Sequence, residues 1–196
     1  MTAGRRKATY EDVLAAPEHV VAEVLDGELF LSPRPAPRHA LAHTAVTSLI
    51  GGPFGLGRGG PGGWLILAEP ELHLHDDIVV PDIAGWRIER MPRLPKEAFF
   101  SVAPDWVCEV LSPSTRRIDR LLKRPIYAKN GIGHMWHVDP LERSVEMYKL
   151  FREHWLWLGV SAEDERVRAE PFEAIELELG LLWELPGAAS ETEAAT

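Results

Sequence analysis

The residues best suited to chemistry are two acidic side chains in apolar surroundings. Asp82 follows Pro81 at the start of an apolar stretch, and Glu109 stands inside the apolar run Trp106–Val110. A carboxylate is costly to bury unless it is paired or bound to a cation. If the two segments are neighbouring strands, their carboxylates form a site of hard oxygen ligands that suits Mg²⁺ or Mn²⁺. The structural alternative is that Asp82 caps a turn and Glu109 pairs with an arginine.

A lysine follows these acids on a predicted helix. Asp119, Lys123 and Tyr127 are spaced four residues apart, so a helix over residues 116–130 places them in one stripe. A lysine that faces the two carboxylates can stabilise the charge that develops on a phosphate group. The alternative is an ion pair in solvent, which would predict nothing about the direction of the stripe. Pro125 lies within this helix and should kink it.

Two histidine pairs have spacings that occur in metal sites. His39 and His43 are four residues apart on a predicted helix, but Ala40 stands where a zinc protease of this spacing would have glutamate. His73 and His75 share one face of a predicted strand and would support a different function, that of a small β-rich metalloenzyme. A hairpin tip at the surface explains this second pair equally well.

Hydrophobic periodicity and turn residues indicate the elements that must position these groups. The turn Asp26-Gly27 is a strong hairpin signal. The run 51–63 holds eight glycines and is predicted to be a mobile loop. The pattern predicts an α/β or α+β domain with one twisted sheet between helices. The predicted helices are 10–16, 39–50 and 116–130, and the predicted strands are 20–25, 28–32, 64–68, 71–75, 79–86, 105–111, 134–138, 144–150, 154–158 and 165–170, with a final segment over 172–182 that packs back on the body.

Length and composition indicate a single globular domain. The chain has 196 residues, of which 45% are hydrophobic and 26% charged, and this suits one domain with a substantial core. We expect that domain over residues 9–186, with flexible tails at 1–8 and 187–196. No signal peptide or membrane-spanning run is evident, which predicts a cytoplasmic location. Cys108 is the only cysteine, so internal disulfides and cysteine-rich zinc sites are excluded, and we expect it to be a buried strand residue.

The charge balance bears on the choice of partner. The formal net charge is −9 and the isoelectric point is about 5.4, which does not favour a protein that coats nucleic acid. A metal site concentrates carboxylates, and a local basic patch can still bind a phosphate backbone. The charge therefore weakens the case for tight DNA binding but does not exclude nuclease chemistry.

Six short motifs, in order along residues 9–183, resemble the pattern of the Uma2 (DUF820) proteins. The resemblance implies a restriction-endonuclease-like core of the PD-(D/E)XK type, with a mixed twisted sheet flanked by helices. It also implies a divalent metal, Mg²⁺ or Mn²⁺, and endonuclease activity on DNA. The motifs are Glu23 before Asp26-Gly27-Glu28, Ser32-Pro33 with His39, Pro81-Asp82, the run Glu109-Val110-Leu111-Ser112-Pro113-Ser114-Thr115, Asp119 with Lys123 and Tyr127, and Gly131-Ile132 followed by Met135-Trp136, Val138 and Asp139.

The resemblance also implies roles for individual residues. Asp82 and Glu109 would be the metal ligands, and Glu23 an additional acid near the metal. The lysine of this superfamily normally lies two residues after the acid, where this chain has Leu111. Lys123 on the following helix would then supply the missing ammonium.

Several neighbours complete the expected site. A backbone carbonyl, which we predict to be that of Val110, would be a third metal ligand. His39 would stand near the site, with Asp119 and Tyr127 in supporting positions. The chain departs from the family at His134-Met135-Trp136, where Glu-Tyr-Trp is usual, and this change does not touch the expected ligands.

The favoured function is that of a metal-dependent endodeoxyribonuclease. The alternative is a binding or assembly module that keeps the fold without turnover. We also predict a homodimer, because cleavage of both DNA strands is easiest with two copies and two-fold pairs are the commonest oligomer. Its expected interface includes Tyr148, Leu150, Trp155 and Trp157, which in a monomer would instead lie under segment 172–182.

Overall fold

The computed structural model describes residues 6–184, and its larger sheet has six strands in the order β10-β9-β8-β7-β6-β3. Only the β7–β8 pair is parallel, so the sheet is mixed. The parallel pair is joined by the helical segment after β7, as a parallel connection requires. The strands are β3 (Trp64–Ala68), β6 (Ile83–Arg87), β7 (Trp106–Val110), β8 (His134–Asp139), β9 (Ser144–Phe151) and β10 (His154–Ala162).

A second sheet has four strands in the order β2-β1-β5-β4. Its β1–β2 hairpin turns at Asp26 and Gly27, which both have positive φ, as the Asp-Gly signal predicts. A separate two-stranded ribbon lies near the C-terminal end of the described chain. The strands are β1 (Val20–Leu25), β2 (Glu28–Pro33), β4 (Leu72–Leu74), β5 (Asp77–Val79), β11 (Arg166–Val167) and β12 (Leu177–Glu178).

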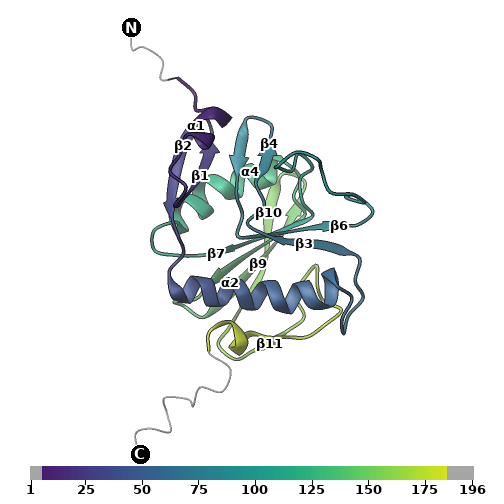
Figure 1. Ribbon diagram of the computed structural model, residues 1–196. Helices are drawn as coiled ribbons and strands as arrows, with labels where there is room; N and C mark the ends of the chain where they lie inside the picture. Colours follow the sequence, from purple (N-terminus) through teal and green to yellow (C-terminus); the bar gives the residue numbers. More distant parts are fainter. Residues whose placement is uncertain (1–5, 185–196) are drawn as a thin grey trace, which may run out of the picture.

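The helices flank the six-stranded sheet. Figure 1 shows α2 along one side of its strands, with α4 and the β1–β2 hairpin on the other. The mixed α+β class with a twisted sheet between helices is therefore confirmed, but the prediction of a single sheet was wrong. The helical segments are α1 (Tyr10–Leu14), α2 (Pro37–Ile50), η1 (Gly51–Gly55), α3 (Arg116–Ile118), η2 (Asp119–Lys123), α4 (Arg124–Lys129) and η3 (Leu179–Leu182).

Each face of the larger sheet has its own apolar core. One core lies between the sheet, α2 and the final segment, where Phe172 is fully buried against Trp64, Trp106 and Trp136. The predicted return of segment 172–182 onto the body is confirmed. The other core packs α4 and the four-stranded sheet against the opposite face.

The predicted strand 79–86 is two strands in two different sheets. β5 ends at Val79 and β6 begins at Ile83, and the chain crosses between the sheets over residues 80–82. Pro81 has no amide hydrogen and cannot continue a strand ladder. This break places Asp82 between the end of β5 in one sheet and the start of β6 in the other.

A π-helical turn lies just before Pro125 in the helical segment. Residues 116–129 follow one helical path, but η2 has π-helical geometry, and the amide of Arg124 donates to the carbonyl of Asp119, five residues back. A proline removes one backbone donor and crowds the preceding turn, which favours this wider spacing. A π-helical turn therefore lies just before the proline at which a kink was predicted, and the kink itself stays a prediction.

The remaining expectations concern loops and ends. The run predicted as a loop over 51–63 begins with the π-helical turn η1, so its first five residues were predicted wrongly. Within the expected N-terminal tail, the amide of Ala8 donates to the carbonyl of Gly27 at 2.8 Å. Residues 1–5 and 187–196 lie outside the described residues. No helix within 6–184 is long and apolar enough to cross a membrane.

Candidate metal and catalytic site

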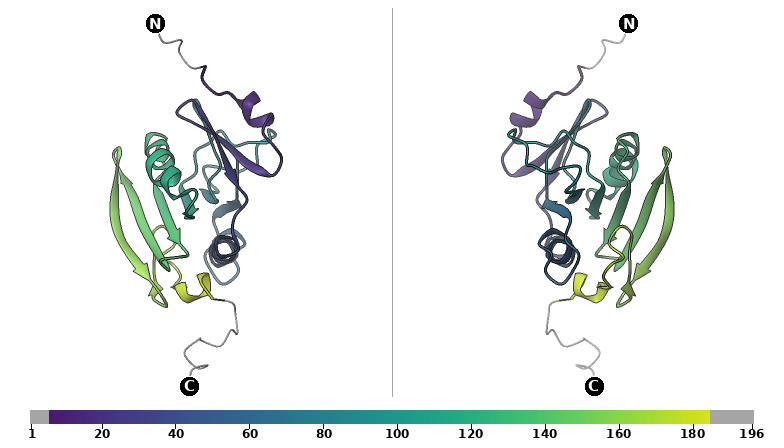
Figure 2. Two further views of the ribbon diagram at one scale, coloured as in Figure 1. Left: turned by 90° about the vertical axis from the view of Figure 1, so that its left-hand side faces the viewer. Right: turned by 90° about the vertical axis from the view of Figure 1, so that its right-hand side faces the viewer.

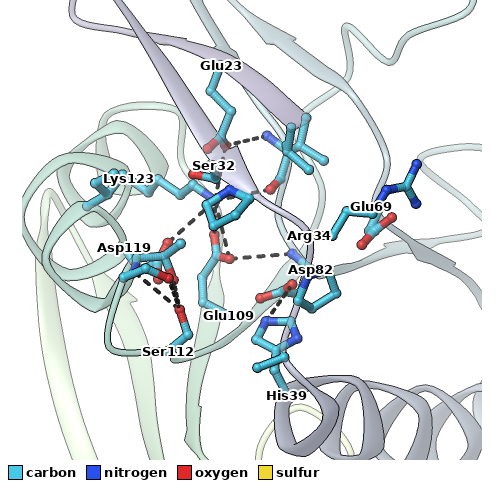
Figure 3. Close-up of a pocket in the computed structure, with 18 of the residues that line it drawn as sticks. Glu23, Ser32, Arg34, His39, Glu69, Asp82, Glu109, Ser112, Asp119 and Lys123 are labelled. Atoms are coloured by element: carbon cyan, nitrogen blue, oxygen red, sulfur yellow. Dashed lines mark hydrogen bonds and ion pairs between the residues drawn. The ribbon is translucent and has the colours of Figure 1, made fainter. Parts of the chain in front are cut away.

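A pocket opens where the two sheets and two helical segments meet (Figure 3). The hairpin contributes Glu23, α2 contributes His39, and the crossover between the sheets contributes Asp82. β7 contributes Glu109, and η2 contributes Lys123. These groups are up to 100 residues apart in the sequence, and every one of them was expected in the site.

Asp82 is held by groups from two elements. Its carboxylate accepts a hydrogen bond from the amide of Val110 at 2.7 Å and lies 3.1 Å from Nε2 of His39. Burial tends to raise the pKa of Asp82, but the His39 contact, the charge of Lys123 and the Val110 amide together hold that pKa below its usual value. Asp82 is therefore an ionised carboxylate in the pocket.

Glu109 lies deeper and is almost completely buried. Its carboxylate accepts hydrogen bonds from the hydroxyl of Tyr127 and from the backbone amide of Asp82, the latter at 3.4 Å. Burial raises the pKa of Glu109 well above its ordinary value, despite the opposing effect of Lys123. Such a carboxylate gains most from a cation that enters the pocket.

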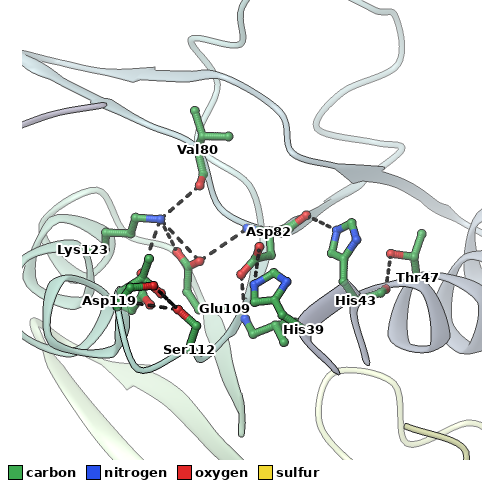
Figure 4. A network of polar contacts seen from close by, with 12 residues as sticks. His39, His43, Thr47, Val80, Asp82, Glu109, Ser112, Asp119 and Lys123 are labelled. Carbon is green, nitrogen blue, oxygen red and sulfur yellow. Dashed lines mark hydrogen bonds and ion pairs between the residues drawn. The ribbon is translucent and has the colours of Figure 1, made fainter. Parts of the chain in front are cut away.

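Lys123 is buried with its ammonium among acidic groups (Figure 4). The Nζ atom lies 3.0 Å from Glu23, 3.4 Å from Glu109 and 3.5 Å from Asp119. It also donates to the carbonyl of Val80 at 3.0 Å. Burial alone would lower the pKa of Lys123, but the surrounding carboxylates outweigh it and raise that pKa well above normal.

The stripe expected on the helix faces the site. Asp119, Lys123 and Tyr127 all turn toward Glu109 or its partners, even though the π-helical turn changes the local spacing. Burial raises the pKa of Asp119, and burial with the charge of Glu109 raises that of Tyr127 well above normal. The alternative of a solvated ion pair on this stripe is wrong, because Lys123 and Asp119 are both buried.

Glu23 approaches the site from the hairpin. Its carboxylate accepts the amide hydrogen of Val80 at 2.8 Å and pairs with Lys123. Burial raises the pKa of Glu23, and Lys123 partly offsets this effect. Lys123 is the cation that contacts Glu23, so the expected place of Glu23 near a metal stays a prediction.

The two histidine pairs do not make separate metal sites. His39 contacts the carboxylate of Asp82, whereas Nε2 of His43 lies 2.8 Å from the backbone carbonyl of Asp82. His73 stacks on Phe99 with ring centroids 3.7 Å apart. His75 contacts Asn130 on the surface instead of its predicted partner. The reading of a β-rich metalloenzyme built on this second pair is therefore wrong.

Two further groups lie close to Glu109 in the sequence. Asp105 directly precedes β7, and its carboxylate accepts hydrogen bonds from Arg90 and from the amide of Arg87 outside the pocket. Val110 contacts Asp82 through its amide, and its carbonyl as a metal ligand stays a prediction. Within residues 6–184, no group of three or more His, Cys, Asp or Glu side chains is arranged around a metal position.

Sequence reasoning missed several groups that line the pocket. Ser112 and Thr115 were named only as part of a family motif and given no role in the site, but their hydroxyls lie 2.9 Å apart at the pocket. Arg34 and Glu69 also line it. Only the position of Ser112 and Thr115 just after Glu109 could have signalled this, since Arg34 and Glu69 reach the pocket through tertiary folding alone.

Comparison with known proteins shows to which family the chain belongs. A family model named Uma2, described as "Putative restriction endonuclease", matches residues 8–181. The chain belongs to the Uma2 family. No curated protein matches the chain.

Among solved structures, the Uma2 chain is similar to one described as a "putative nuclease belonging to DUF820" from Anabaena variabilis ATCC 29413. The two chains are 25% identical, and the match covers 90% of this chain and 97% of the other with a TM-score of 0.72. This agrees with the family resemblance and confirms the nuclease-like fold.

Proposed function

We propose that this Uma2 chain is a metal-dependent endonuclease that hydrolyses DNA phosphodiester bonds. The observation that carries the proposal is the convergence of Asp82, Glu109 and Lys123 on one pocket. Two carboxylates that can ligate a metal and a buried ammonium that can stabilise charge on a phosphate form a set of groups that fits metal-assisted phosphoryl chemistry. Clusters of groups with perturbed pKa values, such as these, mark functional sites.

The donor set fits a hard divalent cation, Mg²⁺ or Mn²⁺. Asp82 and Glu109 would hold it through carboxylate oxygens, with the Val110 carbonyl as third ligand. When bound, such a cation acts as a Lewis acid on phosphate oxygens and lowers the pKa of water. The high pKa of Glu109 supports this assignment, because a second positive charge would relieve the excess of buried carboxylates.

The protein groups around that position have distinct tasks. The amide of Val110 and the ring of His39 fix the carboxylate of Asp82. The hydroxyl of Tyr127 orients Glu109. The ammonium of Lys123 is held by Glu23 and Asp119 close to Glu109, where it would stabilise negative charge on the scissile phosphate.

DNA is the substrate that we assign, in spite of the acidic chain. The exposed residues Arg34, Arg38 and Arg117 lie at or next to pocket-lining positions, and none makes an ion pair within residues 6–184. Such cations can bind a phosphate backbone locally while the net charge stays negative. The expected cytoplasmic location belongs to this proposal.

The alternative is a binding module that keeps the fold without turnover, which the net charge of −9 favours. An assay on plasmid, single-stranded DNA and RNA separates the two, with Mg²⁺, Mn²⁺ or EDTA present. We expect cleavage of DNA with either metal, none with EDTA, and none by Asp82→Asn with either metal. Activity that survives in EDTA, or in Asp82→Asn, would contradict the proposed site, and no cleavage under any condition would favour the binding module.

A further inference from the structure

The end strand β10 leaves one of its edges unpaired in the larger sheet. Among the strands that the structure describes over residues 6–184, β10 pairs with β9 alone and is the longest, with nine residues. Figure 2 shows the β9–β10 pair at one outer side of the molecule, away from the β1–β2 hairpin. An unpaired edge presents backbone amides and carbonyls that can accept another strand.

The side chains of β10 do not protect this edge. Residues 155–162 contain no charged residue and no proline. Natural proteins usually place lysine, proline or inward-pointing charges on an exposed edge to prevent pairing. β10 carries none of these over residues 155–162, and its one irregularity is a bulge between Trp157 and Gly159, so most of its length is suited to pairing.

Large apolar groups are exposed on both faces of β10. Trp157 is 59% exposed and stands opposite Tyr148 of β9, whereas Leu156 is 55% exposed and stands opposite Lys149. Adjacent strand residues point to opposite faces. The final segment 172–182 packs in the core under α2, so the predicted cover for a monomer is wrong. Of the residues predicted at the interface, Trp157 is exposed, whereas Tyr148 is buried in the core on the α4 face and cannot contact a partner as predicted. A strand added at the edge covers both faces, which docking on one face would not do.

We propose that two copies of the chain pair antiparallel through β10 about a two-fold axis, joining their six-stranded sheets. An antiparallel strand pair is self-complementary, so one sequence supplies both sides. Arg152 and His154 precede or begin β10 beside the single acid Glu153, so this end has no net negative charge. Two acids, Glu163 and Asp164, follow the other end of β10, where they share the single cation Arg143. Antiparallel pairing brings the more basic start of one strand to the acidic end of its copy, and parallel pairing would not.

Two other occupants of the edge are less suitable. Residues 185–196 of the same chain are rich in alanine, with proline, glycine and two glutamates, and these types are depleted in strands. An unrelated partner strand would need its own complementary charges, whereas a second copy already has them.

The pairing goes beyond the nuclease proposal because it does not depend on activity. Glu109 is three strands from β10, so the two pockets would lie on the order of 30 Å apart along the sheet, each complete within one chain.

Light scattering after size-exclusion chromatography tests the pairing. We expect twice the single-chain mass of 21.9 kDa at micromolar concentration. Leu156→Lys and Val160→Lys, tested separately, should each shift the protein to the single-chain mass. The matched control is Leu94→Lys, since Leu94 is 64% exposed and lies outside this strand. A wild-type monomer, or a dimer that resists both β10 substitutions, overturns the proposal.

Hydrogen exchange on the wild-type chain tests the pairing without any substitution, so its result does not depend on whether the variants fold. The β10 amides that point away from β9 should be protected at high concentration and lose protection on dilution. Fast exchange of these amides at every concentration overturns the pairing. Metal-dependent nicking of plasmid should persist in a folded Leu156→Lys variant, so the failure of the dimer and the failure of the nuclease site give different results.

Discussion

The ammonium of Lys123 and the carboxylate of Glu23 lie 3.0 Å apart and join elements from opposite sides of the pocket. Lys123 belongs to η2, which packs on the six-stranded sheet, and Glu23 belongs to β1 of the four-stranded sheet. The same ammonium donates to the carbonyl of Val80, at the crossover between the sheets. Lys123 is thus a structural cross-link as well as a group with a proposed catalytic role.

Lys123→Ala should destabilise the metal-free protein by about 3–5 kcal/mol near pH 8, because it leaves buried carboxylates without their cation. Burial already raises the pKa values of Glu109 and Asp119, so in the variant the native state binds more protons than the unfolded chain. Its stability should then increase as the pH falls toward the ordinary carboxyl range. Urea unfolding at pH 8 and pH 6 measures this.

Lys129→Ala is the matched control, since Lys129 is exposed on the same helical segment. It should change stability by less than about 0.5 kcal/mol. Activity of the folded Lys123→Ala protein with Mg²⁺ should fall roughly 10²-fold. Equal, small losses of stability in both variants would contradict the buried role of Lys123.

Glu109→Gln should stabilise the metal-free protein while removing metal binding. The amide still accepts hydrogen bonds from Tyr127 and Lys123, but it lacks a charge that burial disfavours. With a raised native pKa, wild-type Glu109 costs stability progressively as the pH rises from its unfolded to its folded pKa. The advantage of the variant should therefore grow with pH, and a gain on the order of 1 kcal/mol would raise the Tm by about 2–4 °C.

Thermal unfolding with EDTA and with Mn²⁺ checks this prediction at several pH values. Wild-type protein should gain stability with Mn²⁺, because the ligand binds only the native state, and Glu109→Gln should not. Glu97→Gln, at an exposed position, should behave like the wild type. Retention of the Mn²⁺ effect in Glu109→Gln would remove Glu109 from the ligand set.

Tyr127→Phe removes the hydroxyl that bonds Glu109. Loss of a hydrogen bond to a charged group should cost about 1.5–3 kcal/mol. Tyr148→Phe removes a similar bond to Glu146, at 2.8 Å, outside the pocket-lining set. Both variants should lose stability, but only Tyr127→Phe should weaken Mn²⁺ binding in isothermal titration. Equal metal affinities would make Tyr127 a purely structural residue.

Arg34→Ala and Arg117→Ala test the contact with DNA. Each lost phosphate contact should weaken duplex binding and reduce the slope of log K against log salt by about 1. Fluorescence anisotropy over a series of KCl concentrations with EDTA present gives both quantities without cleavage. Arg93→Ala is the control, because Arg93 is exposed and does not line the pocket. Unchanged slopes in both test variants would place the DNA elsewhere.

The acids and the lysine of the site could be predicted from sequence because their environments are local. An acid within the apolar run Trp106–Val110 needs a partner wherever the strand lies. Asp119, Lys123 and Tyr127 are four residues apart, and their side chains still face the site although a π-helical turn lies between the first two. The hairpin at Asp26 was equally local, since its two turn residues dictate positive φ.

The division into two sheets could not be predicted in the same way. Residues 77–79 and 83–87 are both apolar strands in sequence, and their different partners, Val24 and Val107, are set by long-range pairing. Pro81 marks a break but does not indicate that the chain changes sheets. The contribution of Arg34 to the pocket likewise depends on how the chain leaves β2, for which the sequence carries no periodic signal.

Because the chain crosses between the sheets at residues 80–82, the proposed site is complete only when both sheets have folded and packed together. Glu23 of the four-stranded sheet and the Val80 carbonyl at the crossover hold Lys123, whereas Glu109 belongs to the six-stranded sheet. If the smaller sheet detaches first, Lys123 loses two of its partners and Asp82 loses its fixed position before the larger core melts. For the proposed nuclease, a nascent or partly unfolded chain would therefore not cleave DNA, and activity would arise only as the last contacts between the sheets close.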